Sequence, residues 1–234
     1  MTTQRPTGSR AAHIASERAN ERLIDWLGSA KPARRLTRRT ALIASAAALI
    51  VARSSSAYAA PSGRSIPKFV GYVGDYFPFD TPQILPRIVF EDATGKEHDL
   101  SAMAGRIVLL NFWATWCAPC LAEMPDLDQL QAYYSGRDFG VLALCTDARS
   151  VQTVSDFLVA HGLRNLGTYF DPTGEDMHNC AISAMPTSFI IDRSGRARGI
   201  LPGAAPWASP TGRALIAYYL AEIPGNASAW MNKS

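Results

Sequence analysis

Residues 112–120 read Phe-Trp-Ala-Thr-Trp-Cys-Ala-Pro-Cys, and this stretch constrains the fold more than any other part of the chain. The run before it, residues 106–111, is apolar and β-branched, which is typical of a buried parallel strand. Residues 121–130 after it have apolar side chains at helical spacing. Cys117 and Cys120 are therefore expected where a strand passes into a helix. The dipole and free N–H groups of a helix N-terminus stabilise a thiolate.

The spacing of these two cysteines predicts thiol–disulfide exchange. A thiolate can attack a disulfide and then be released by a second cysteine three residues on. A structural zinc site is disfavoured because it needs a second ligand pair. Cys145 and Cys180 lie far apart in the chain, and His178 makes only a tight His-x-Cys with Cys180. A purely structural disulfide gains little from closing so short a loop. We therefore expect the cysteine pair itself to be the redox centre, with no metal and no separate cofactor.

The residues around the pair resemble the periplasmic TlpA/ResA branch of the thioredoxin superfamily. Thioredoxin has a buried acid five residues before the tryptophan of its Trp-Cys motif, and this chain has Asn111 there. The branch instead carries a Glu three residues after the second cysteine, which Glu123 matches. Residues three apart share a helix face, so the resemblance places Glu123 beside Cys120, where it could accept the thiol proton. The alternative is an ordinary solvated helix residue.

A second matching element lies at residues 184–195, where Met185-Pro186 precedes a β-rich run and a turn-forming Asp-Arg-Ser-Gly. Superfamily members carry a cis-proline before a strand, facing the cysteines, and Pro186 resembles it. The resemblance implies that Pro186 and the Met185 backbone bind an extended substrate segment, with Trp116 shaping the same groove. The alternative is a trans proline at the first residue of a strand.

The resemblance covers residues 83–223 and implies one α/β domain. Its fold would be a thioredoxin-like central mixed sheet flanked by helices, with an N-terminal β-hairpin and the TlpA/ResA-type insertion. Alternating strands and helices independently favour a sheet covered on both faces. The expected elements are a hairpin over 87–101, strands over 106–111, 140–147, 166–170 and 187–191, and helices over 121–130, 151–161 and 215–220.

The N-terminal quarter of the chain differs from the rest in charge. Residues 1–59 carry a net charge of +7 and residues 60–234 carry −4, so the domain offers no electrostatic basis for nucleic-acid binding. Residues 41–52 are apolar, but twelve residues are too few for a bilayer span, which takes about 20. Ala57-Tyr58-Ala59 fits the small-x-small cleavage rule. We expect residues 1–59 to be a cleaved signal peptide and the mature protein to be periplasmic.

The leader also contains Thr37-Arg38-Arg39-Thr40, which resembles the twin-arginine export motif. The alternative is a general secretory leader in which the arginines are incidental. Residues 60–82, rich in Pro, Gly and Ser, are expected to be a linker, and residues 224–234 a C-terminal tail.

The resemblance implies a mechanism and partners. Cys117 would be the exposed thiolate that attacks a protein disulfide, and Cys120, helped by Glu123, would resolve the mixed disulfide. By analogy with the branch, we expect a disulfide reductase that draws electrons from a membrane thiol transporter. Its clients would be the haem-binding cysteines of apocytochrome c or the copper-site cysteines of proteins in oxidase assembly.

The sequence leaves other functions open, and it leaves open whether Cys145 and Cys180 form a disulfide. A copper-binding module could use Cys117 and Cys120 as soft ligands, although a proline opposite the pair argues against it. A peroxiredoxin-like peroxidase would want Thr-x-x-Cys, and a disulfide-forming oxidase would be expected to carry His where Pro119 stands. Cys145 and Cys180 are expected to be buried, inert thiols, with a second disulfide as the alternative.

Overall fold

The computed structural model describes residues 65–147 and 150–222. The expected signal peptide and C-terminal tail lie outside this described part. No helix within it is long and apolar enough to cross a membrane. In chain order, the elements are β1 (Phe77–Gln83), β2 (Val89–Glu91), β3 (Glu97–Asp99), the 3-10 helix η1 (Leu100–Met103), β4 (Ile107–Trp113), α2 (Ala118–Tyr133), β5 (Phe139–Cys145), α3 (Val151–Ala160), β6 (Tyr169–Phe170), α4 (Asp176–Asn179), β7 (Thr187–Ile191), β8 (Ala197–Pro202) and α5 (Pro210–Leu220).

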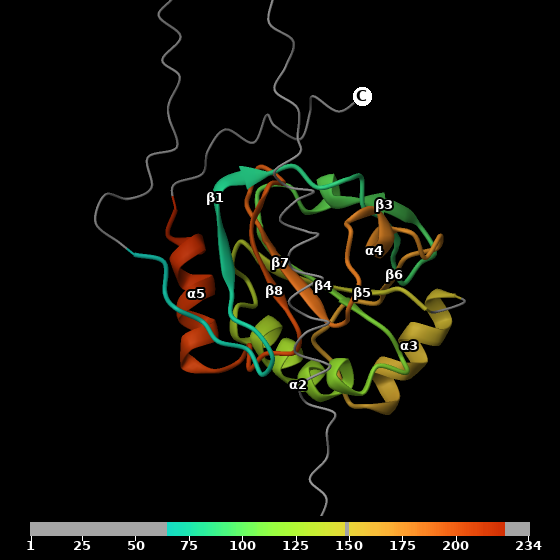
Figure 1. The fold of residues 1–234 in the computed structure, drawn as a ribbon. Helices are drawn as coiled ribbons and strands as arrows, with labels where there is room; N and C mark the ends of the chain where they lie inside the picture. The colour runs from blue at the N-terminus through green and yellow to red at the C-terminus, as the bar shows by residue number, and fades with distance from the viewer. Residues whose placement is uncertain (1–64, 148–149, 223–234) are drawn as a thin grey trace, which may run out of the picture.

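The strands of the described residues form one mixed sheet in the order β1-β8-β7-β4-β5-β6-β2-β3 (Figure 1). The strands β4, β5 and β6 run parallel to one another, and β7 and β8 continue the sheet in antiparallel pairs. The expected thioredoxin-like α/β fold is therefore confirmed. The N-terminal hairpin is also confirmed, as the antiparallel pair of β2 and β3.

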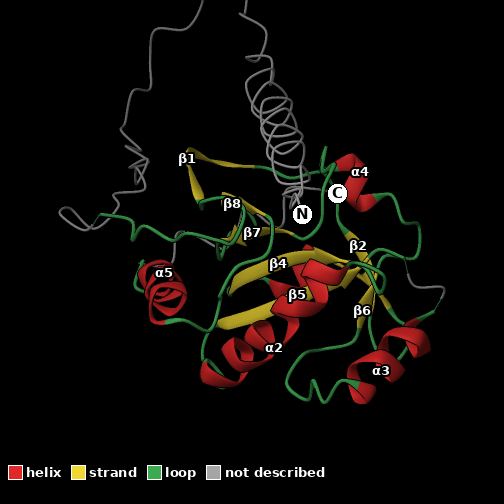
Figure 2. Cartoon of the chain, turned by 60° about the horizontal axis from the view of Figure 1, so that its bottom comes forward, coloured by secondary structure: helices red, strands yellow, loops and turns green. Residues whose placement is uncertain are grey.

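The two central strands, β4 and β5, are buried along their whole length because both of their faces are covered. On one face, Leu109 and Val141 belong to a core cluster with apolar side chains of α2, α3 and α5. On the other face, Leu110 and Leu142 pack with the N-terminal hairpin and with the segment around α4. Figure 2 shows the three longer helices on one side of the sheet and α4 on the other.

The remaining expected elements are present with shifted ends. The helix α3 buries Val154 and Leu158, as its amphipathic pattern predicted. The strand β6 spans two residues and is shorter than expected. The helix α5 begins earlier than expected because Ser209 caps it: the Ser209 side chain accepts a hydrogen bond from Gly212 N, and Pro210 occupies the first turn.

The prediction that residues 60–82 form a linker is wrong for the described residues 65–82. These residues pack against the domain, and Phe77–Gln83 forms β1 antiparallel to β8 at the edge of the sheet. Phe69 lies against Trp207, with ring centroids 4.8 Å apart, and the hydroxyls of Tyr76 and Tyr219 are 2.8 Å apart. Prolines suggested a linker, but an edge strand tolerates proline, and buried aromatic side chains hold this segment in place.

Candidate active site

Cys117 and Cys120 lie at the N-terminus of α2, shortly after the end of β4, and a disulfide with an S–S distance of 2.05 Å joins them. Cys117 is the N-cap residue of α2, and its Sγ accepts a hydrogen bond from Cys120 N at 3.3 Å. The sulfur of Cys117 therefore sits at the positive end of the helix dipole, next to an N–H group that lacks an intrahelical partner. This is the environment that stabilises a thiolate after the disulfide is reduced.

The expectation that Cys117 is exposed is wrong for this disulfide form. Cys117 is 4% exposed and Cys120 is 0% exposed. The Cys117 sulfur is turned inward because it bonds to Cys120 Sγ and accepts from Cys120 N. The neighbouring Trp116, at 70% exposure, is instead the prominent surface side chain of this loop.

Glu123 lies on the first turns of α2 and is buried, with 1% exposure. Its Oε1 accepts a hydrogen bond from Asn111 Nδ2 at 2.7 Å, and its Oε2 accepts one from Ala205 N at 2.9 Å. Burial raises the pKa of the Glu123 carboxyl from 4.5 to about 7, although both hydrogen bonds oppose the rise. The alternative of a solvated helix residue is wrong. This carboxyl can gain or lose a proton near neutral pH.

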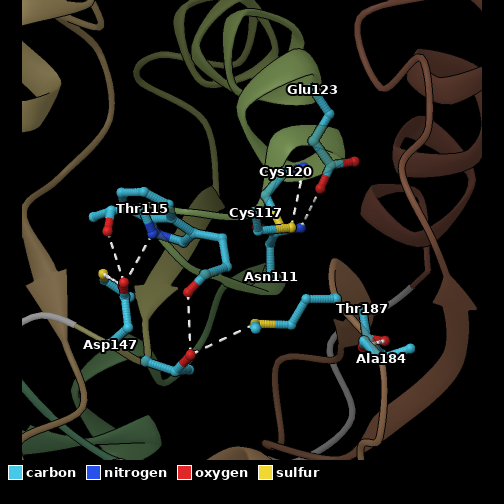
Figure 3. Close-up of a disulfide and its surroundings, with 12 residues drawn as sticks. Asn111, Thr115, Cys117, Cys120, Glu123, Asp147, Ala184 and Thr187 are labelled. Atoms are coloured by element: carbon cyan, nitrogen blue, oxygen red, sulfur yellow. Dashed lines mark hydrogen bonds between the residues drawn. A yellow bond between two sulfur atoms is a disulfide. The ribbon is translucent and has the colours of Figure 1, made fainter.

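Asn111 and Glu123 point toward each other beside the disulfide, as Figure 3 shows. Asn111 comes from the middle of β4 and also donates from Nδ2 to Ser188 Oγ of β7, at 2.9 Å. Its Oδ1 is buried without a hydrogen-bond partner among the described residues. The position where thioredoxin has an acid therefore holds an amide that bonds the acid of α2.

Met185-Pro186 is a cis peptide bond, as the resemblance predicted. The Pro186 carbonyl accepts a hydrogen bond from Gly203 N at 2.7 Å. Thr187, directly after Pro186, pairs with Phe112 near the end of β4, so the proline segment lies at the end of the sheet from which the chain continues to the cysteines.

A polar cluster that the sequence analysis missed holds this end of the sheet together. Asp147, just after β5, accepts hydrogen bonds from Thr115 N at 3.0 Å and from Thr115 Oγ1 at 2.6 Å (Figure 3). Thr146 donates through Oγ1 to Trp113 O at 3.2 Å and to Met185 Sδ at 3.6 Å. The end of β5 thus contacts both the loop before Cys117 and the residue before Pro186. The signal available in the sequence was an Asp placed directly after a buried parallel strand.

Cys145 and Cys180 are buried thiols outside the disulfide, which confirms the expectation of reduced cysteines. Cys145 packs on the face of the sheet that α2 covers, and its Sγ donates to Asp147 Oδ1 at 3.2 Å. Cys180 packs on the opposite face, where burial raises its pKa to about 12. The sheet separates the two sulfurs, and the raised pKa keeps Cys180 protonated. Residues 65–147 and 150–222 contain no group of three or more His, Cys, Asp or Glu side chains placed to hold a metal ion.

Comparison with known proteins identifies relatives of this site and fold. The model of the Redoxin family matches residues 61–210. Thiol-disulfide oxidoreductase ResA of Bacillus cereus is 31% identical over 128 residues, which cover 55% of this chain and 73% of that protein. ResA of Bacillus subtilis is 29% identical over 118 residues, which cover 50% and 65% of the two chains.

Solved structures agree with this likeness. A crystal structure assigned as a thiol:disulfide interchange protein DsbE, from Chlorobium tepidum, matches with a TM-score of 0.52 and 30% identity. The match covers 60% of this chain and 99% of that one. A crystal structure assigned as a thiol-disulfide oxidoreductase from Bacteroides vulgatus matches with a TM-score of 0.52 and 26% identity, over 59% and 96% of the two chains.

Proposed function

The chain belongs to the Redoxin family and is a TlpA/ResA-like thiol-disulfide oxidoreductase, and from this premise we propose that it is a periplasmic disulfide reductase. The observation that carries the exchange chemistry is the buried carboxyl of Glu123, and the reducing direction rests on the resemblance to the TlpA/ResA branch. This carboxyl lies one helical turn after Cys120 and has a pKa of about 7. A buried base with this pKa suits proton removal from a buried thiol at neutral pH.

The reaction begins with both cysteines reduced. The Cys117 thiolate attacks one sulfur of a client disulfide, a new S–S bond joins Cys117 to the client, and the other client sulfur leaves as a thiolate. Cys120 then transfers its thiol proton to Glu123, and the Cys120 thiolate attacks the Cys117 sulfur. The second client sulfur leaves. Two electrons have passed to the client, which is now a dithiol, and the enzyme holds the Cys117–Cys120 disulfide.

The residues around the pair have distinct roles in this proposal. Trp116 and the backbone of Met185 and Pro186 would hold the client segment against Cys117, and their place at one end of the sheet supports this role. Asn111 and Ala205 hold the Glu123 carboxylate through the hydrogen bonds to its two oxygens. These bonds favour the ionised form that can accept the proton.

The partners follow from the resemblance to the TlpA/ResA branch. We propose that a membrane thiol transporter returns the enzyme to its dithiol form. We propose as clients the haem-binding cysteines of apocytochrome c, or the copper-site cysteines of proteins in oxidase assembly. The sequence features of residues 1–59 support export to the periplasm.

The reduction potential of the Cys117/Cys120 pair tests the direction of electron flow. A reductase should equilibrate at about −230 mV or lower, whereas a value near about −120 mV belongs to an oxidant of client thiols. The protein is equilibrated in dithiol/disulfide buffers, denatured in acid and labelled with a thiol-specific reagent. Cys145 and Cys180 give a constant background of two labels, so the oxidised protein takes two labels and the reduced protein four. A potential near the oxidant value would overturn the proposal.

A further inference from the structure

A tight turn at residues 71–74 exposes two large apolar side chains. Gly71 N donates to Gly74 O at 2.8 Å, and Val70 pairs with Asp75 in an isolated bridge. Tyr72 and Val73 occupy the tip of the turn, with 67% and 54% of their surface exposed. Polar residues are the usual occupants of an exposed turn tip, so two apolar side chains there need an explanation.

This turn is fixed against the segment that follows β8. Tyr72 N donates a hydrogen bond to Ala204 O at 2.8 Å. Gly203 has a φ of +87°, and a Cβ at this residue would lie 2.9 Å from Val73 Cβ. The turn therefore approaches the backbone at Gly203 as closely as a glycine allows. In Figure 1 the cyan chain before β1 bends beside the orange-red chain that follows β8.

The segment after β8 also contacts the active site on either side of Ala204. Gly203 N donates to Pro186 O at 2.7 Å, and Ala205 N donates to Glu123 Oε2 at 2.9 Å. Three consecutive residues thus contact the proline beside the cysteines, the apolar turn, and the buried acid. The tip of the turn is separated from Pro186 by a single backbone segment.

We propose that Tyr72 and Val73 form a docking surface for the client polypeptide, next to the site of disulfide exchange. The occupant is an extended client segment that carries an aromatic or branched aliphatic residue within a few positions of its disulfide cysteine. The proposal rests on the proposed function, because the client disulfide must reach Cys117. Each extended residue spans about 3.3 Å, so a segment that passes Pro186 reaches the turn within a few residues.

The chemistry of the surface selects this kind of occupant. The tip of the turn has no charged side chain, and the flanking charges of Lys68 and Asp75 have opposite signs, 4.0 Å apart. Apolar contact therefore decides what binds there. A second copy of the chain is disfavoured, because a stable dimer buries more than about 1,000 Å² and an aromatic side chain supplies only about 150–250 Å². A short peptide segment needs no more than such a surface.

The experiment compares three disulfides as substrates of the reduced full-length protein in single-turnover kinetics. The first is a peptide with a Leu or Phe near each cysteine, the second replaces those residues with Ser, and the third is bis(2-hydroxyethyl) disulfide. The double variant Tyr72→Ser/Val73→Ser should raise the half-saturating concentration of the first peptide about tenfold, and leave its saturating rate unchanged. The rates with the other two disulfides should also remain unchanged.

The control is the double variant Tyr133→Ser/Val159→Ser, which removes a matched pair of exposed side chains from the end of α2 and from α3. It should leave all three reactions unchanged. Equal half-saturation by wild type and by the Tyr72/Val73 variant would overturn the docking surface. Loss of a dimer in that variant, measured by sedimentation, would assign the surface to self-association and also overturn it. If wild type reduces none of the three disulfides, the proposed function fails instead.

Discussion

Asn111 Nδ2 donates a hydrogen bond of 2.7 Å to Glu123 Oε1 inside the domain, where both residues have almost no solvent exposure. In this orientation the Asn111 amide donates to the Glu123 oxygen, which fits an ionised carboxyl. A half-turn of the Asn111 amide would present its unpartnered Oδ1 instead, which fits a protonated carboxyl. An amide at this position can therefore bond Glu123 in both protonation states, whereas a second carboxylate would repel it.

The first prediction concerns the pKa of Glu123. Asn111→Leu removes a hydrogen bond to the carboxylate and adds apolar surroundings, so the pKa of Glu123 should rise further above its value of about 7. The protonated carboxyl band in the infrared spectrum, followed against pH, measures it. Ser188→Ala is the control, because it removes the other partner of Asn111 Nδ2 and leaves the bond to Glu123. An unchanged titration in Asn111→Leu would show that the hydrogen bond has no influence on this proton.

The second prediction concerns the resolution of the mixed disulfide. Glu123→Gln keeps the side-chain shape and removes the base, so attack by Cys120 should slow by roughly 10- to 100-fold near neutral pH. Attack by Cys117 on a client disulfide should change far less, because the helix terminus stabilises its thiolate. The decay of a purified mixed disulfide is followed between pH 6 and 8, with the exposed Glu97→Gln as the control. A wild-type rate of decay in Glu123→Gln would remove the base role from Glu123.

The third prediction concerns stability against pH. The pKa of Glu123 is raised in the folded protein, so the folded state holds this proton more tightly than the unfolded state does. The contribution of this proton to the free energy of unfolding is fully present below about pH 4.5 and is lost as pH rises through about 7. This rise in the pKa of Glu123 corresponds to about 3 kcal/mol in the free energy of unfolding. Urea unfolding of the oxidised protein should show this fall.

The same unfolding series with Glu123→Gln isolates the effect. The pKa of Asp176 is also raised to about 7, mainly by burial, and its effect on stability has the same sign. It is present in both proteins and cancels in their difference. The free energy of unfolding of wild type minus that of Glu123→Gln should therefore fall between about pH 4.5 and 7. A difference that does not depend on pH would contradict a raised pKa at Glu123.

The sequence was sufficient for the parts of the fold that have a strong local pattern. The apolar runs of β4 and β5 and the turn after β7 follow from side-chain type alone, and the position of Cys117 and Cys120 at the start of α2 follows from them. The placement of Glu123 beside this site came from helical spacing together with the family resemblance. Its burial could not be derived locally, because Ala205, which bonds it, is 82 residues away.

Contacts over long sequence separations account for what the sequence missed. The segment before residue 83 has the prolines of a linker, and its role as β1 depends on pairing with β8, more than a hundred residues later. Thr115 and Asp147 are 32 residues apart and meet because β4 and β5 end side by side. Their residue types alone do not indicate that they are partners.

The fourth prediction concerns export and rests on the leader sequence. Changing Arg38 and Arg39 together to Lys should leave the precursor in the cytoplasm, because the twin-arginine route requires both arginines. Cell fractionation followed by immunoblotting measures the distribution. Changing Arg34 and Arg35 to Lys is the matched control and should leave export intact. Normal periplasmic accumulation of the Arg38/Arg39 variant would assign the leader to the general secretory route.

The last prediction concerns the contact between Asp147 and Thr115 that fixes the loop before Cys117. The Asp147 carboxylate accepts from both the backbone N and the hydroxyl of Thr115, and a hydrogen bond to a charged group contributes about 1.5–3 kcal/mol. Asp147→Ala should therefore lower the free energy of unfolding by about 2 kcal/mol, and Thr115→Val by about 1 kcal/mol. When Asp147→Ala is already present, adding Thr115→Val should lower the free energy of unfolding by almost nothing more. In the otherwise wild-type protein, Thr115→Ser keeps the hydroxyl and should preserve wild-type stability. Additive losses in this double-mutant cycle, measured by urea unfolding of the oxidised protein, would show that the two side chains stabilise the domain independently.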